Sequence, residues 1–436
     1  MTKRYHTSVE FSSLKRRNVH VSFEGGDITS DGGALLLREA DKRLGLTEAA
    51  SRALHDPRRR GACQHSQLSM LRQRIFGLAL GYEDINDHIK MRHDGALKTA
   101  VGEIDSLASS STLCRFEQRA DARSAFNIHK LYIDQFVSSH KCAPEELVLD
   151  FDATHDLVYG EQIGRRFNGF YDGYCFLPLY VFCGKQLLVS YLRPSNLGAS
   201  HHAAAVLKLL VRELRKHWPQ VKIIIRADAG FCNPLLLNWC DRNKVDYVIG
   251  MIKNSALTEK AGYLILLSGI LYRTTNKPQR HFGEFQYQAR TWNQKRRMVV
   301  KTEYSEKGEN TRYVVTSIKG KPRFIYETLY CARGNMENCI KEQKSLFSDR
   351  TSCHQWWPNQ FRLLLSGLAY VLMEAIRRIA LQNTEFETSQ FDTIRLKLLK
   401  IGGIVLINTR SIRLLLPTHF PYQAIFIKAA KVFSTA

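Results

Sequence analysis

Two aspartates stand where predicted strands end, a position from which two carboxylates can share a metal ion. Residues 147–152 alternate apolar side chains with others, which predicts a strand that ends at Asp152. Residues 221–225 are apolar apart from Lys222, which predicts a largely buried strand, and Asp228 follows it. If the strands are neighbours, the two like charges lie at one edge of the sheet and favour a shared proton or a bound cation. Hard oxygen ligands favour Mg2+ or Mn2+, whereas an ordinary turn or N-cap role is the alternative for either aspartate.

A third carboxylate is available from the predicted helix over residues 330–344. Four of its side chains fall within a sector of about 60° when successive residues are placed about 100° apart. These four are Tyr330, Arg333, Glu337 and Lys344. Glu342 is turned about 140° away from Glu337, so Glu337 is the acid that shares a face with the cations. The alternative is an ordinary amphipathic helix with an i,i+4 ion pair between Arg333 and Glu337.

The elements that must position these residues alternate along the chain, which predicts an α/β domain. Strands are expected at 147–152, 174–182, 186–192, 221–225 and 246–251, with helices at 202–216 and 234–243. Residues 251–330 interrupt this order with alternating segments that predict an antiparallel meander. Before the α/β part we expect a mainly helical region that includes a helix over 34–42. After it we expect a helix over 360–381 and a hairpin over 404–416.

The composition favours a polyanionic partner. The 436 residues carry a formal net charge of +22, which attracts nucleic acid through counterion release. An anionic membrane surface is the competing reading, but no basic amphipathic terminal helix or lipidation motif supports it. The most apolar stretch, Leu363–Met373, is shorter than the roughly 20 residues that span a bilayer. No P-loop is present. No apolar run typical of a signal peptide follows Met1–His6, and the ten cysteines form no C-x-x-C pair. We therefore expect reduced thiols in a cytoplasmic protein.

The spacing Tyr330-x2-Arg333-x3-Glu337-x6-Lys344 resembles the Y-R-E-K motif of DDE transposases of bacterial insertion sequences. The amino-acid sequences of several segments are most similar to those of one branch, the thirteen-eighty group. Those segments are Leu149–Thr154, Tyr171–Tyr174, Arg226–Phe231 and Met336–Asn338. The resemblance extends over most of the chain. It implies an RNase H-like catalytic core interrupted by a β-rich insertion, with a mainly helical N-terminal region and a C-terminal α/β tail.

The resemblance also implies roles for individual residues. Asp152, Asp228 and Glu337 would be the catalytic residues and would hold two Mg2+ or Mn2+ ions; Asp150, which faces the same way as Asp152, is the alternative first ligand. DNA contacts would come from Tyr330, Arg333 and Lys344. The basic insertion itself adds Trp292, Arg296 and Arg297 as candidate DNA contacts. Trp292 would stack on an unpaired base or pack in the core of the insertion. Residues 295–297 would form a solvated hairpin turn that touches phosphate.

We therefore expect a transposase that binds terminal inverted repeats and target DNA, synapses two ends as a homodimer, and acts in the bacterial cytoplasm at the nucleoid without a membrane partner. The expected regions are 1–145 (helical, DNA-binding), 146–250 (first part of the core), 251–329 (insertion), 330–350 (catalytic helix) and 351–436 (tail). Arg58 to Arg60 and Arg115 to Arg119 are the expected phosphate contacts of the first region. The competing functions are an RNase H-like nuclease or resolvase and a domesticated DNA-binding protein without catalysis.

Overall fold

The computed structural model describes residues 8–59, 61 and 63–434, and the chain forms two compact units. Unit 1 comprises the residues up to Glu117 together with those from Leu372 onward, and unit 2 comprises Gln118–Val371. The division falls within helix α13 (Trp356–Ala375). Arg60 of the predicted phosphate-contact run, and the start of the chain considered for a signal peptide, lie outside the described residues.

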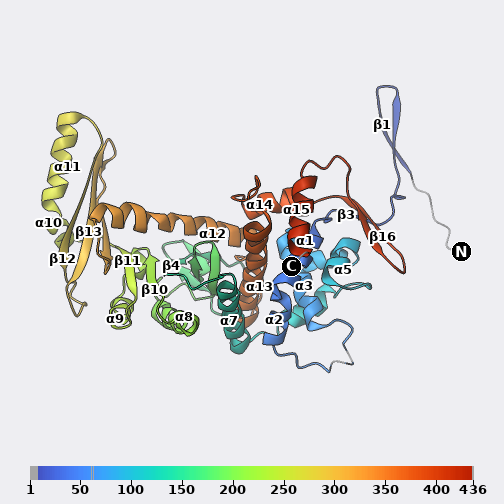
Figure 1. Cartoon of the computed structure of the whole chain (residues 1–436), viewed down its shortest axis with the longest axis horizontal. Helices are drawn as coiled ribbons and strands as arrows, with labels where there is room; N and C mark the ends of the chain where they lie inside the picture. Colours follow the sequence, from blue (N-terminus) through green and yellow to red (C-terminus); the bar gives the residue numbers. More distant parts are fainter. Residues whose placement is uncertain (1–7, 60, 62, 435–436) are drawn as a thin grey trace. The chain divides into compact units, whose positions relative to one another are not determined.

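Unit 2 is built on a nine-stranded mixed sheet in the order β12-β13-β15-β11-β10-β4-β8-β9, with β14 paired to β13 (Figure 1). The strands are β4 (Glu146–Ala153), β8 (Leu179–Cys183), β9 (Gln186–Tyr191), β10 (Lys222–Ala227), β11 (Asp246–Met251), β12 (Gln279–Tyr287), β13 (Arg296–Ser305), β14 (Gly308–Glu309) and β15 (Arg312–Thr316). β4, β10 and β11 run parallel, and every other pair is antiparallel. The predicted strands 147–152, 186–192, 221–225 and 246–251 correspond to β4, β9, β10 and β11, and the predicted helices to α8 (Ala203–His217) and α9 (Pro234–Arg242).

The two faces of the sheet differ in the side chains that they carry. Leu147, Leu149 and Phe151 of β4 lie in the main hydrophobic core, which α7 (Ala122–Ser138), α8 (Ala203–His217) and α9 (Pro234–Arg242) cover. The alternate residues of β4, Asp150 and Asp152, therefore point to the opposite face. Figure 1 shows α8 and α9 on one side of the sheet and α12 (Gly334–Ser345) on the other.

The insertion differs from the predicted meander. It begins with two helices that the alternation pattern missed, α10 (Ser255–Lys260) and α11 (Gly262–Thr275). Its strands do not form a sheet of their own, because β15 pairs with β11 and so continues the main sheet. The apolar run Gly262–Leu271 is compatible with either a buried strand or a helix, and packing against β12 and β13 selects the helix.

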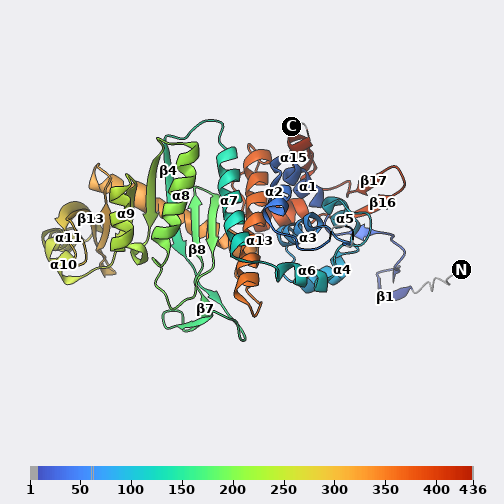
Figure 2. The same ribbon diagram turned by 90° about the horizontal axis from the view of Figure 1, so that it is seen from below.

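The predicted strand over 174–182 is divided between two sheets. Pro178 lacks a backbone N–H, and it separates β7 (Gly173–Phe176) from β8. β7 pairs instead with β5 (Asp156–Leu157) and β6 (Arg166–Asn168) in a small antiparallel sheet. We call residues 155–176 the flap; Figure 2 shows β7 projecting beyond the end of β8.

Unit 1 is mainly helical. The predicted helix over 34–42 is confirmed as α1 (Ala34–Leu44), and the predicted hairpin over 404–416 as β16 (Gly403–Ile407) with β17 (Ile412–Leu415), to which β3 (Ile28–Thr29) adds a strand. A further hairpin, β1 (Val9–Leu14) with β2 (Arg17–Val21), was not predicted. The remaining helices are α2 (Leu46–Ala53), α3 (Gln67–Leu80), α4 (His88–Met91), α5 (Gly95–Val101), α6 (Ser110–Glu117), α14 (Phe391–Ile394) and α15 (Gln423–Ser434). Among the described residues, no helix has both the length and the apolar character needed to cross a membrane.

A buried ion pair joins β4 to β10 close to the ends of both strands. Asp150 and Arg226 lie opposite each other in the parallel register. The Arg226 guanidinium donates to both carboxylate oxygens of Asp150, at 2.5 and 2.8 Å, and to the carbonyl oxygen of Leu329 at 2.7 Å. Burial raises the pKa of Asp150, and the hydrogen bonds and charge of Arg226 oppose that rise. The pair therefore fixes where each strand ends and ties both strands to the segment that leads into α12.

Removing one partner of this pair should destabilise unit 2. For Asp150→Ala we expect a loss of about 3–5 kcal/mol in the free energy of unfolding, because Arg226 keeps a buried charge without its carboxylate. The double variant Asp150→Leu/Arg226→Met should lose less, because neither charge remains. All five tryptophans lie in unit 2, so urea unfolding followed by tryptophan fluorescence measures this unit. A double variant at least as unstable as the single one would contradict the expectation.

Candidate active site

Asp152 and Asp228 lie at the same end of two neighbouring parallel strands. In the register of β4 and β10, Phe151 is opposite Ala227, and each aspartate is the next residue of its strand's chain. The Asp152 side chain is largely buried and accepts a hydrogen bond from the backbone N–H of Ala153 at 2.9 Å. Asp228 is half-buried and accepts one from Gly230 N–H at 2.8 Å, as the cap of a short 3-10 turn. The expected meeting of the two strand ends is confirmed.

Residues 324–345 carry the remaining candidates, but not on one regular helix. A π-helical turn (Phe324–Tyr330) and a 3-10 turn (Cys331–Arg333) precede α12. The predicted angles about a uniform α-helix therefore apply only within α12. Arg333 is nevertheless placed as a bridge: its guanidinium lies 3.0 Å from an oxygen of Asp152 and 3.6 Å from an oxygen of Glu337. The ion pair of Arg333 with Glu337 is thus present, and it is joined to the sheet through Asp152.

The electrostatics show three carboxylates that influence one another. Burial raises the pKa of Asp152 to about 6 against the opposing effect of Arg333, and the charges of Asp228 and Glu337 raise it further. Burial acts to lower the pKa of Arg333, but the same three carboxylates raise it above the ordinary value. Arg333 is thus the positive charge that this acidic edge of the sheet holds.

Tyr330 lies over the end of β11. A Cβ built on Gly250 would lie 2.6 Å from the Tyr330 hydroxyl oxygen and 2.9 Å from the backbone nitrogen of Ala229. The strand can therefore approach both groups only because residue 250 has no side chain. Burial raises the pKa of Tyr330, and the negative charge of Asp228 contributes to the same shift. Tyr330 is consequently held beside the second aspartate.

Lys344 reaches the chain that follows β4. Its ammonium group donates to the carbonyl oxygen of His155 at 3.0 Å and lies 3.9 Å from a carboxylate oxygen of Asp156. Asp156 is fully buried, and burial raises the pKa of its carboxyl well above the ordinary value. Lys344 therefore holds residues 155 and 156, three and four residues after Asp152.

The other predicted DNA contacts lie on β13 and in the loop between β12 (Gln279–Tyr287) and β13 (Arg296–Ser305). Trp292 is buried in the core against Tyr287 and carries the Arg296 guanidinium 5.2 Å from its ring centre. Arg296 begins β13, is buried, and donates to Asp241 at 2.6 Å. Arg297 pairs with Glu284. The expectation of a solvated turn at 295–297 is met only by Lys295, because the register of β13 turns Arg296 into the core.

The predicted basic contacts nearer the N-terminus are divided between the units. Arg58 lies in unit 1, where its guanidinium bonds Asp56 at 2.7 Å. Arg115, also in unit 1, donates to Thr112 at 3.2 Å, whereas Arg119 belongs to unit 2. Their contact with DNA remains a prediction.

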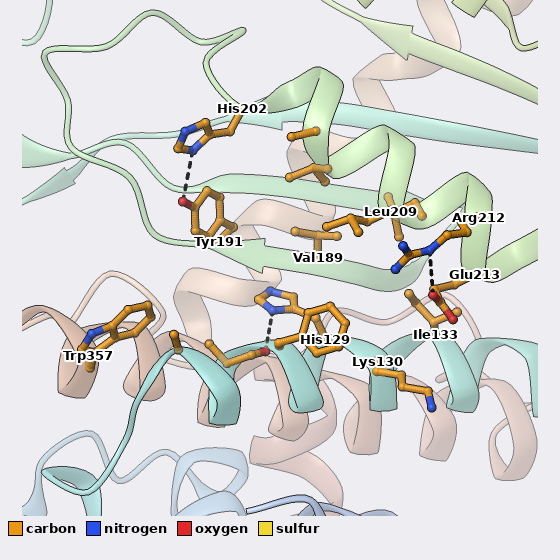
Figure 3. A pocket seen from close by; sticks show the side chains of 16 residues that line it. His129, Lys130, Ile133, Val189, Tyr191, His202, Leu209, Arg212, Glu213 and Trp357 are labelled. Atoms are coloured by element: carbon orange, nitrogen blue, oxygen red, sulfur yellow. Dashed lines mark hydrogen bonds and ion pairs between the residues drawn. The ribbon is translucent and has the colours of Figure 1, made fainter. Parts of the chain in front are cut away.

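A separate cavity of about 390 Å³ lies beside the edge strand β9 (Figure 3). Its wall is mostly apolar and comes from α7, β9, α8 and Trp357. Tyr191 donates to or accepts from His202 at 3.1 Å at its rim. None of the three candidate carboxylates lines it, so the chemistry expected of the carboxylates lies elsewhere in the unit.

Two supporting residues escaped the sequence reasoning. Arg226 forms an ion pair with Asp150, and Gly250, which has no side chain, lets the Tyr330 hydroxyl approach β11. Arg226 could have been noticed as a charge in a strand otherwise predicted to be buried, since such a charge needs a partner. Gly250, inside a strand, is a known sign of close approach by another chain segment.

The fold and the acidic edge define a mixed α/β protein with a carboxylate site. The sequence profile described as "Transposase DDE domain group 1" matches residues 11–436, and the chain therefore belongs to this family of DDE transposases. No curated protein matches the chain in sequence. A solved structure with a similar chain is the cryo-electron microscopy structure of the piggyBac transposase synaptic complex with hairpin DNA. The identity is 11% and the TM-score 0.41, over 85% of this chain and 80% of that chain.

DDE transposases use divalent metal ions, and the donor set here suits such an ion in its chemistry. Three carboxylates supply hard oxygen ligands, and the negative charges of Asp228 and Glu337 add to the larger effect of burial in raising the pKa of Asp152. Within the described part of the chain, however, no three His, Cys, Asp or Glu side chains form a ready-made metal cluster. The side chain of Glu337 is 59% exposed and pairs with Arg333, so binding an ion between all three carboxylates requires this pair to rearrange.

The raised pKa of Asp152 makes a prediction about stability. A carboxyl with a raised pKa costs no stability below about pH 3, where it is protonated in both the folded and unfolded states. The cost grows as the pH rises from about 4, the unfolded pKa, to about 6, the folded pKa, and is constant above that. In metal-free buffer, Asp152→Asn should therefore be more stable than the wild type at about pH 8, by roughly 1–3 kcal/mol, and should lose this advantage at about pH 3. Urea unfolding followed by tryptophan fluorescence at the two pH values measures this, and an unchanged or lower stability at about pH 8 would contradict it.

The close approach at Gly250 makes a second prediction. Gly250→Ala places a methyl group against a backbone nitrogen that cannot easily give way, so we expect a loss of about 1–3 kcal/mol in the free energy of unfolding. Gly262→Ala is the matched control, because a Cβ there meets no atom within 4 Å. The same unfolding assay applies to both variants, and equal stabilities would show that the β11 end is not tightly packed.

Proposed function

We propose that this DDE transposase belongs to a bacterial insertion sequence of the thirteen-eighty group, binds the terminal inverted repeats of that element, and catalyses DNA strand cleavage and strand transfer. The catalytic residues of the proposal are Asp152, Asp228 and Glu337. The observation that carries it is the position of Arg333, between an aspartate at the end of β4 and a glutamate on α12.

The sheet order supports an RNase H-like core within unit 2. β4, β8 and β9 are antiparallel neighbours, and β10 and β11 follow parallel to β4. In this arrangement Asp152 and Asp228 meet at the carboxyl ends of adjacent strands, and the α12 segment crosses the face to which Asp152 points. Asp152 is preferred to Asp150 as the first ligand, because one guanidinium, that of Arg226, binds both oxygens of Asp150. The charges of Asp228 and Glu337, the other two proposed ligands, instead act on Asp152.

The proposed metal requirement is for two Mg2+ or Mn2+ ions held by the three carboxylates. When bound, such ions would activate water and then a DNA 3′-OH and would stabilise the leaving oxygen. Before metal and DNA bind, Arg333 partly neutralises the acidic edge. Its guanidinium can donate hydrogen bonds to a phosphate in the same way as to a carboxylate. Tyr330 and Lys344 flank the two aspartates and would contact phosphates of the cleaved strand.

The further DNA contacts proposed from the sequence are Trp292, Arg296 and Arg297. In the free protein these side chains pack within the core and the sheet, so contact with DNA requires Trp292 and Arg296 to leave their present partners. The proposed partners are the terminal repeats, a target DNA and a second copy of the chain at synapsis, and the region 1–145 is the proposed reader of the repeats. The net charge of +22 supports a DNA partner.

Loss of any one carboxylate should abolish cleavage while leaving DNA binding intact. We expect Asp152→Asn, Asp228→Asn and Glu337→Gln each to reduce cleavage of a terminal-repeat DNA in Mg2+ or Mn2+ by at least about 1000-fold. Glu213→Gln is the matched control, because Glu213 lies on α8 and pairs only with its helix neighbours Arg212 and Lys216. Gel assays of cleavage and of end binding measure the two properties. Cleavage at the wild-type rate by one of the three variants would remove that residue from the site.

The competing functions predict different products. A nuclease would cleave the DNA but would not join a 3′-OH end to target DNA, whereas a catalytically inactive DNA-binding protein would not nick a terminal repeat at all. If inverted repeats flank the reading frame, they would be the substrate to use in these assays, and finding them would support mobility directly.

A further inference from the structure

The flap is firmly anchored although it projects from the main sheet. The side-chain amide of Gln162 donates to the carbonyl oxygen of Thr351 at 2.6 Å, and Asn359 donates to Gln162 at 2.9 Å. On the other side, Ser195 donates to the carbonyl oxygen of Arg166 at 2.8 Å, and Asn168 donates to that of Ser195 at 2.8 Å. These bonds hold β6 and the loop before it in a defined position.

Aromatic side chains are exposed on this anchored element. Phe170, in the turn between β6 and β7, is 88% exposed, and Tyr159 is 79% exposed. Phe167 and Tyr174 form a cross-strand pair with ring centres 5.7 Å apart, and each is about half exposed. Large aromatic side chains normally bury most of their area, so a group of exposed rings on an ordered element marks an interaction surface.

Cations accompany these rings. The Arg165 guanidinium lies 4.7 Å from the centre of the Tyr174 ring, and Arg166 is exposed on the neighbouring strand. Aromatic rings combined with arginine are the composition that binds single-stranded nucleic acid, because bases stack on the rings and the cations attract phosphates.

The turn between β6 and β7 also comes close to the candidate active site. The Tyr171 ring stacks on His155 with centres 4.1 Å apart, and it contacts the Phe170 ring edge-on at 4.9 Å. The carboxylates of Asp152 and Asp228 both act on the phenol of Tyr171, whose pKa is raised mainly by burial. The exposed ring of Phe170 therefore contacts the Tyr171 ring, which stacks on His155, three residues after Asp152.

We propose that the flap binds single-stranded DNA beside the cleavage site, with Phe170 as the ring on which a base stacks and Tyr171 and His155 as its support. This inference rests on the proposed function, because it assigns the unpaired strand of the same DNA substrate to the flap. A base pair inside duplex DNA does not present its face to a protein ring, so the surface selects nucleotides that have left the helix.

The inference is tested by measuring the binding of a short oligothymidylate, about ten nucleotides long, to the full chain in EDTA. Fluorescence anisotropy of the labelled strand gives the affinity. We expect Phe170→Ala to weaken binding about tenfold, as the loss of one stacked base does, whereas Phe170→Trp should retain it. Tyr263→Ala is the matched control, because Tyr263 is 75% exposed on α11 of the same unit and lies outside the flap.

A duplex of the same length separates stacking from general attraction to phosphate. Phe170→Ala should bind the duplex as the wild type does, and the quenching of a 2-aminopurine base in the single strand should be lost in this variant alone. Unchanged affinity of Phe170→Ala for the single strand would overturn the inference, as would an equal loss for single strand and duplex. Normal tryptophan fluorescence and unfolding of the variant establish that the fold is intact.

The outcome is independent of catalysis. Binding is measured without metal ions and without cleavage, so the flap can pass this test even if the carboxylate variants still cleave DNA. Conversely, loss of cleavage in the carboxylate variants together with unchanged oligothymidylate binding by Phe170→Ala would support the proposed function and remove the flap from it.

Discussion

The constraint on which this structure depends is the cost of bringing carboxylates together where water is partly excluded. Asp152 is largely buried, and two other negative charges act on it. Such an arrangement is unfavourable unless a cation is near. In the free protein Arg333 is that cation, and it links the end of β4 to α12. In the proposed function, bound metal ions and a DNA phosphate would take over this role of Arg333, so the negative charge of the acidic edge would be compensated in both states.

Three separate contacts from the surrounding elements fix the position of this acidic edge. Asp150 with Arg226 fixes the neighbouring ends of β4 and β10, Gly250 lets Tyr330 approach the second aspartate, and Lys344 secures the start of the flap. Each of these contacts joins residues that are far apart in sequence. The acidic edge is consequently a product of the whole of unit 2, including the insertion, whose strands continue the same sheet.

The sequence indicated the candidate site more readily than its surroundings. Asp152 and Asp228 were recognisable because strand periodicity and burial patterns are local, and the spacing from Tyr330 to Lys344 is local as well. The insertion was less predictable: an apolar run such as Gly262–Leu271 suits a helix or a strand, and only packing decides between them. The positions of Trp292 and Arg296 depended on the register of β13, which no local pattern specifies. The small sheet of the flap could not be predicted, because β5, β6 and β7 are too short to give a periodic pattern in the sequence.

The sequence by itself determined the kinds of groups present: acidic residues at strand ends, a spaced set of cations and acid before α13, and a strongly basic chain. The tertiary structure alone decided which aspartate is bound by Arg226. Arg226 and Asp150 are 76 positions apart, and they meet only because β4 and β10 pair. The tertiary structure also decided that Arg333, rather than an isolated helix pair, bridges the sheet and α12. Local patterns record the preferences of neighbouring residues, whereas long-range pairing depends on the free energy of burying the whole sheet, and that quantity belongs to no single segment.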